Sequence, residues 1–102
     1  MKATGMKSLE EFRGSLAAAA PPAGIDHALV ALWWAGKGEW TRAHEVVQAH
    51  EDDDRCNWVH AHLHHQEGDL SNAGYWYRRA KKPESKVSVP EEWMELAVAL
   101  LK

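Results

Sequence analysis

Apolar residues along this chain recur at spacings of three and four, and no segment alternates apolar and polar positions with a period of two. This spacing is typical of helices that bury one face, and it argues against strands. We therefore predict an all-α fold built as three antiparallel helix pairs. The expected helices cover approximately residues 9–20, 25–37, 39–51, 55–67, 70–81 and 90–102.

Local signals mark both ends of the first predicted helix. Ser8 followed by Glu11 is the capping-box pattern of a helix N-terminus, and residues 1–7 before it are predicted to be unstructured. Pro21 and Pro22 cannot continue a helix, so we expect the first helix to end just before them. Its apolar stripe is then formed by Leu9, Phe12, Leu16 and Ala19.

A run of four acidic residues, 51–54, separates the third and fourth predicted helices. It could chelate a hard cation, but it lacks the alternating ligand positions and the turn glycine of a calcium-binding loop. We interpret it as a solvated connector, and we expect its last residue, Asp54, to cap the helix that follows.

The turn before the fifth helix repeats the turn before the third. Gly38 corresponds to Gly68, Trp40 to Leu70 and Ala43 to Ala73, always with an offset of thirty residues. Glycine can adopt the left-handed conformation that ends a helix, and alanine permits close approach of two helices. A helical hairpin repeated at such a period is characteristic of solenoid proteins.

These residues carry a resemblance to a known family. The segment that carries it best is Gly68-Asp69-Leu70 followed by Ala73, Tyr77 and Ala80, with Ala61 at the small position of the preceding helix. It resembles the second half of a tetratricopeptide repeat, and residues 73–80 are also similar to the Sel1-like repeat. The resemblance covers roughly residues 25–82. It differs from the family in its repeat length, which is about four residues shorter than usual.

This resemblance implies a domain organisation and a class of function. Residues 1–24 would form an N-terminal helix and linker, residues 25–82 two stacked hairpins, and residues 83–102 a helix that caps the open end of the stack. The whole chain, 1–102, is then one helical-repeat domain. Proteins of this kind mostly bind other proteins or peptides, so the first expectation is a small protein–protein interaction module.

Composition excludes several other classes of function. The 102 residues allow one domain, and the net charge of −3 argues against a nucleic-acid partner, which would need a concentrated basic face. A single cysteine, Cys56, fits a reducing compartment, so we expect a cytoplasmic protein. Charged residues interrupt every apolar run long enough for a signal peptide or a membrane span, so no membrane association is expected.

The seven histidines are the most unusual feature of the composition. His60 and His64 lie one turn apart on the fourth predicted helix, a spacing by which helices hold metal ions. His44 of the third helix could complete such a site with a transition metal. The alternative is that His60 and His64 are polar residues of the core, bonded to partners such as Asn57 or a tryptophan indole. Under that alternative His62 and His65 occupy a more exposed face of the same helix.

A partner-binding face follows from the resemblance, because the first helices of such hairpins usually line a concave surface. On the first hairpin this surface is apolar, with Ile25, Ala28, Leu32 and Ala35. We expect the stripe of the N-terminal helix to cover it, either from the same chain or from the second subunit of a homodimer. The polar half stays open and is predicted to bind a protein segment through Arg55, Trp58, His62, His65 and Gln66.

Enzymatic activity is not expected. Cys56 and His60 lie four residues apart and could form a nucleophile and base pair, but no third orienting residue accompanies them. No cofactor-binding motif is present beyond the possible transition metal site. A histidine-rich protein that binds metal or responds to pH is therefore the alternative to the interaction module.

Overall fold

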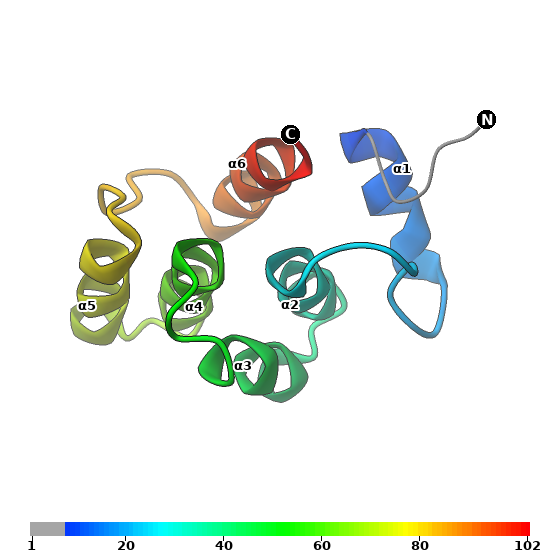
Figure 1. Ribbon diagram of the computed structural model, residues 1–102. Coiled ribbons are helices and arrows are strands. Elements are labelled where there is room, and N and C mark those ends of the chain that lie inside the picture. The colour runs from blue at the N-terminus through cyan, green and yellow to red at the C-terminus, as the bar shows by residue number, and fades with distance from the viewer. Residues whose placement is uncertain (1–7) are drawn as a thin grey trace.

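The computed structural model describes residues 8–102, so the expectation for residues 1–7 lies outside the described part of the chain. Within it there are six α-helices, one short 3₁₀ helix and no strand, which confirms the all-α prediction (Figure 1). The helices are α1 (Leu9–Gly14), η1 (Ser15–Ala17), α2 (His27–Gly36), α3 (Trp40–Gln48), α4 (Asp54–Gln66), α5 (Leu70–Ala80) and α6 (Val89–Leu101).

The N-terminal helix begins as predicted but ends early. The Ser8 side chain accepts a hydrogen bond from the backbone N–H of Glu11 at 3.1 Å, which confirms the predicted cap. The α-helix then stops at Gly14, because the Ser15 hydroxyl donates a hydrogen bond back to the Phe12 carbonyl at 2.6 Å and the chain tightens into η1. The apolar stripe is correspondingly shorter than expected, and Ala19 is exposed.

Helices α2 to α5 form two hairpins whose turns match each other. Gly38 and Gly68 have φ angles of +80° and +83°, so both adopt the left-handed conformation that the sequence required. Each second helix, α3 or α5, begins two residues later. Asp69 caps α5, whereas α4 is capped by Asp53 and not by the predicted Asp54.

Small residues lie where the paired helices approach each other, since Ala43 and Ala73 are both buried. We expect Ala73→Leu to lower the free energy of unfolding by about 1–3 kcal/mol, because the extra carbons would overpack a site beside Ala61 on the neighbouring helix. Glu45→Leu, at an exposed position of α3, should change stability by less than about 0.5 kcal/mol. Urea denaturation of both variants measures the difference. Equal midpoints for the two would contradict the small-residue interface.

The C-terminal helix α6 does not cap the end of the hairpins, which corrects that expectation. It lies across α2 and α4, on the side of these helices opposite α3 (Figure 1). Its buried residues are Glu92, Trp93, Leu96, Ala97 and Leu100. The indole N–H of Trp93 donates a hydrogen bond to the Leu32 carbonyl of α2 at 2.8 Å. The chain's own last helix therefore covers the face on which a bound partner was predicted.

The N-terminal segment packs beside α6 within the same chain. Phe12 is fully buried, and its ring stacks on Trp93 with 5.6 Å between ring centroids. The Trp33 indole of α2 donates a hydrogen bond to the Ser15 hydroxyl at 3.0 Å. The stripe of Leu9, Phe12 and Leu16 therefore packs into the same core as α2 and α6. This agrees with the expectation that the N-terminal helix covers the apolar surface from within the same chain. A homodimer through this helix stays a prediction.

Within residues 8–102, no helix combines the length and the apolar character that crossing a lipid bilayer requires.

Candidate functional site

Three histidine side chains from two helices converge on one point. His60 and His64 come from successive turns of α4, and His44 comes from α3, which packs against α4. One ring nitrogen of each lies within 4.8 Å of the corresponding nitrogens of the other two. The Nε2 atoms of His44 and His60 are closest, at 3.1 Å. The structure therefore brings together the three residues that the sequence singled out as metal ligands.

Aromatic rings fix the orientation of two of these imidazoles. His60 stacks face to face on Trp76 of α5, with 3.7 Å between ring centroids and 13° between the planes. His44 stacks on Trp40 at 4.7 Å and 10°. His60 and His64 are buried and His44 is half-buried. The cluster is thus held rigidly and remains reachable from solvent through the side of His44.

A carboxylate determines which nitrogen of His64 is available to a ligand. The Nδ1 atom of His64 lies 2.6 Å from Oε1 of Glu67, and an ionised carboxylate can only accept a hydrogen bond. Nδ1 therefore carries the proton, and the lone pair is on Nε2. In metal sites, the ring nitrogen of a histidine that does not bind the metal usually donates its hydrogen to a carboxylate or a carbonyl, which orients the ring.

His60 is not fully hydrogen-bonded by the protein. Its Nε2 has another imidazole as its partner, and its buried Nδ1 has none within residues 8–102. Buried polar atoms in native proteins are nearly always paired, so an incompletely paired imidazole requires an explanation. The unpaired atom is Nδ1, whereas Nε2 is the nitrogen that faces His44 and is placed to share a cation with it.

The electrostatic environment of His60 and His44 disfavours their protonated forms. Burial, together with the charges of the neighbouring His44, His64 and Arg79, lowers the pKa of His60 to about 3. Burial also lowers the pKa of His44, with a smaller contribution from His64. Metal ions bind the neutral imidazole, so no proton has to be displaced from these two rings at neutral pH.

The separation of the His44 and His60 nitrogens fits two ligands of one metal ion such as zinc. Zn–N bonds of about 2.0–2.1 Å at tetrahedral angles place two ligand nitrogens about 3.4 Å apart. The 3.1 Å between the nitrogens of His44 and His60 is close to that separation. Three protein nitrogens leave one position for water or another donor, as in sites where zinc acts on a bound molecule.

The residues predicted to bind a partner are placed differently from the expectation. His62 is fully buried, and its Nδ1 lies 2.7 Å from Oε1 of Glu92 on α6. His65 is also largely covered and reaches the same oxygen at 2.8 Å. The interpretation that placed these two histidines on an exposed face is therefore wrong, because α6 lies over that face.

The other three members of the predicted partner face are closer to solvent. Arg55 donates a hydrogen bond to the Leu100 carbonyl of α6 at 2.8 Å and pairs with Asp26 at 2.7 Å. Trp58 is half-buried, with the Lys82 ammonium 4.4 Å from its ring. Gln66 is exposed. These five residues do not form the continuous open surface that the sequence predicted.

Glu92 is the buried charged residue that sequence reasoning missed. It lies in the first turn of α6, where an acidic residue is usually solvated, but its carboxylate is buried and accepts hydrogen bonds from His62, His65 and the Tyr77 hydroxyl. Burial alone would raise the pKa of the Glu92 carboxyl, and these three hydrogen bonds outweigh it and hold the pKa below its usual value. Its position in the sequence could have indicated burial, because Glu92 lies four residues before Leu96 and therefore on the apolar face of the helix.

The cysteine is not paired with a histidine base. Its thiol points to Asp53, with 3.7 Å between Sγ and Oδ2, and not to His60. Burial, together with the neighbouring Asp53 carboxylate, raises the pKa of Cys56 to about 12. The reactive form of a cysteine is the thiolate, so this thiol is a poor nucleophile at neutral pH.

No family model, no curated protein and no solved structure matches this chain. The likeness to tetratricopeptide and Sel1-like repeats thus rests on the residues that carry it.

Proposed function

We propose that this protein binds a single first-row transition metal ion, with Zn²⁺ as the leading candidate, through His44, His60 and His64. The observation that carries the proposal is the convergence of three imidazoles from two helices, with nitrogens of His44 and His60 3.1 Å apart. Imidazole ligands suit zinc, copper and nickel, whereas calcium and magnesium prefer oxygen.

The surroundings of the cluster support a metal more than a polar core. The Nε2 atoms of His44 and His60 face each other at 3.1 Å, so two neutral rings can direct both lone pairs at one cation, whereas without a cation one ring must donate an N–H to the other. The hydrogen bond between His64 and Glu67 is of the kind that orients a metal-ligating histidine, with the carboxylate outside the metal's own ligands. The site also joins the two hairpins, because His44 belongs to the first and His60 to the second.

The interaction module predicted from the repeat-like residues remains an alternative. Its expected binding face is covered by α6, and a partner would have to displace this helix or use another surface. We therefore give the metal site priority.

Native mass spectrometry of the metal-free protein titrated with zinc tests the proposal. We expect one Zn²⁺ per chain. His44→Gln removes a ligand from the partly exposed edge of the site and should abolish the complex at equimolar zinc. Glu67→Gln removes the outer carboxylate and should weaken binding by about 10–100-fold.

A matched control is available in the same chain. His27 and His50 stack on each other with 3.9 Å between ring centroids and belong to none of the three-residue clusters. His27→Gln should leave zinc binding unchanged. Loss of zinc in His27→Gln, or equal binding by His44→Gln and the unmodified protein, would contradict the proposed ligand set.

A further inference from the structure

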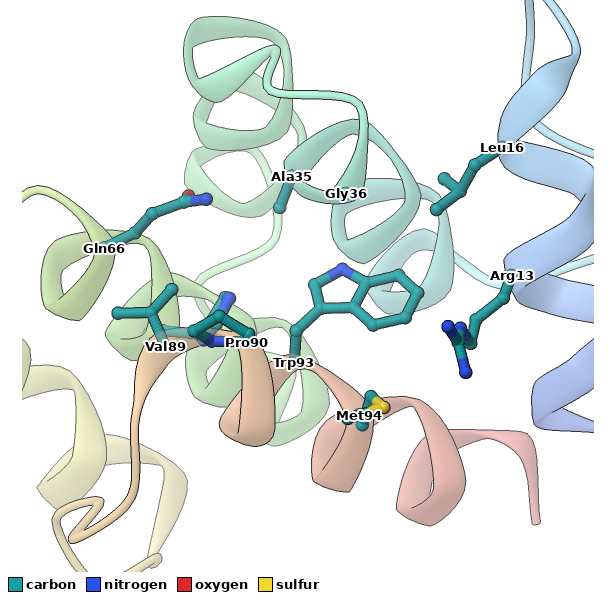
Figure 2. Close-up of a pocket in the computed structure, with 10 residues that line it drawn as sticks. Arg13, Leu16, Ala35, Gly36, Gln66, Val89, Pro90, Trp93 and Met94 are labelled. Carbon is teal, nitrogen blue, oxygen red and sulfur yellow. The ribbon is translucent and has the colours of Figure 1, made fainter.

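Helix α6 lies in a groove whose walls are distant from it in sequence. It packs on α1, α2 and α4, and the linker of residues 81–88 joins it to α5. The Trp93 indole lies against α2 beside Gly36 (Figure 2), where a Cβ would stand 2.9 Å from the Cζ2 atom of the indole. The contacts that hold the buried face of α6 therefore come from helices that precede the linker.

Polar contacts fix the position of α6 along this groove. The buried Glu92 carboxylate accepts hydrogen bonds from His62 at 2.7 Å, from His65 at 2.8 Å and from the Tyr77 hydroxyl. A helix held by apolar contacts alone could slide along a groove, whereas a buried polar network specifies one register. The groove is therefore matched to a helix that carries this carboxylate beside a tryptophan, and a second copy of the chain supplies such a helix.

The linker to α6 lies largely at the surface. Residues 81–84 and 86 are exposed to solvent. Residues 82–87 line a cleft of about 350 Å³, whose other walls are Trp58, Glu92 and Glu95. Chain segments inside a protein are normally closely packed, and this one borders open space. Little packing is therefore lost if the linker takes another path.

The first residue of the linker has a strained backbone. Lys81 has a φ angle of +62° and is the only non-glycine residue of residues 8–102 with a positive φ. The turns after α2 and α4 use Gly38 and Gly68 for the same left-handed conformation, in which a Cβ is unfavourable. Pro83, two residues later, prevents α5 from continuing as a helix. The path that returns α6 to its own chain therefore carries strain that a different path would relieve.

We propose that two copies of this chain exchange α6, so that the helix of each copy occupies the groove of the other. The exchanged dimer repeats the groove contacts of the monomer, because the two copies of α6 are identical. The linker favours the monomer by keeping α6 close to its own groove, and relief of the strain at Lys81 in both chains favours the dimer. The inference does not rest on the metal site, whose histidines belong to α3 and α4.

Refolding at high protein concentration followed by sedimentation velocity tests the inference. A short linker holds a tethered segment at an effective concentration of about 1 mM, so we expect the dimer to form between about 0.1 and 1 mM protein. In a dimer refolded from equal amounts of isotope-labelled and unlabelled chains, isotope-filtered NOEs should connect Trp93 of one chain with Leu32 of the other, because these residues are hydrogen-bonded across the groove. A dimer without these NOEs, or no dimer at about 1 mM, would overturn the proposal.

Substitutions in the linker should shift the exchange in opposite directions. Lys81→Gly removes the strain from the monomer and should weaken dimerisation about tenfold or more. Lys81→Ala is the matched control, since it also loses the exposed ion pair with Asp54 but keeps the Cβ, and it should dimerise like the unmodified protein. Pro83→Ala lets α5 continue into the linker and should strengthen dimerisation about tenfold. Equal dimerisation of Lys81→Gly and Lys81→Ala, or no gain in Pro83→Ala, would contradict an exchange through this linker.

Discussion

Glu92→Ala should destabilise the protein by about 3–5 kcal/mol, the range for removing one partner of a buried charged network. The Glu92 carboxylate is 3 % exposed and accepts hydrogen bonds from α4 and from Tyr77 of α5. Its removal leaves the donors of His62 and Tyr77 buried without an acceptor, and each such group costs about 1–3 kcal/mol. For a domain of this size the melting temperature should fall by more than about 12 °C.

Glu95→Ala is the matched control for this prediction. Glu95 lies on the same helix but is exposed, so its substitution should change stability by less than about 0.5 kcal/mol. Hydrogen exchange provides a local readout, since amides of α6 should lose protection in Glu92→Ala before those of the α4–α5 hairpin. If Glu92→Ala and Glu95→Ala melt together, the buried network does not hold α6 in place.

The helices and their turns could be predicted because their causes are local. Ser8, Asp69 and the two turn glycines act on groups within three or four residues of themselves, and the sequence displays those distances directly. The early end of α1 was missed because a proline was taken as the stop signal. The Ser15 hydroxyl ended the helix first by bonding to the carbonyl three residues earlier.

The histidine cluster was partly predictable for the same reason. Helical spacing places His60 and His64 on one face, and the hairpin repeat places α3 alongside α4, so His44 could be proposed as a third member. The pairing of His64 with Glu67 also follows from spacing. The stacking of Trp76 on His60 could not be read from the sequence, because it depends on how far α5 rotates about its own axis.

The position of α6 could not be predicted from local signals. Its apolar stripe fits either the end of a repeat stack or the groove across α2 and α4, and these alternatives differ in tertiary packing alone. The groove is favoured because it buries Trp93 against α2 and gives Glu92 three hydrogen-bond donors. A buried carboxylate needs such donors, and in the groove they come from α4 and α5.

Acidification should destabilise the metal-free protein through His60. Burial, followed by the charges of His44, His64 and Arg79, lowers the pKa of folded His60 from 6.5 to about 3. Between these two values the unfolded chain binds a proton that the folded state does not, so stability falls as pH decreases. The loss is absent above pH 6.5 and amounts to about 1.4 kcal/mol per pH unit below it, until folded His60 also becomes protonated.

Urea denaturation at pH 7.5, 6.5 and 5.5 in the presence of a chelator measures this dependence. His60→Phe preserves an aromatic ring against Trp76 and removes the titrating group, so its stability should vary less with pH than that of the unmodified protein. Between pH 6.5 and 5.5 the unmodified protein should lose about 1 kcal/mol more stability than His60→Phe, because at pH 6.5 the unfolded histidine is only half protonated. Parallel pH profiles, or an unmodified protein whose stability is constant from pH 7.5 to 5, would show that His60 is not buried in its neutral form.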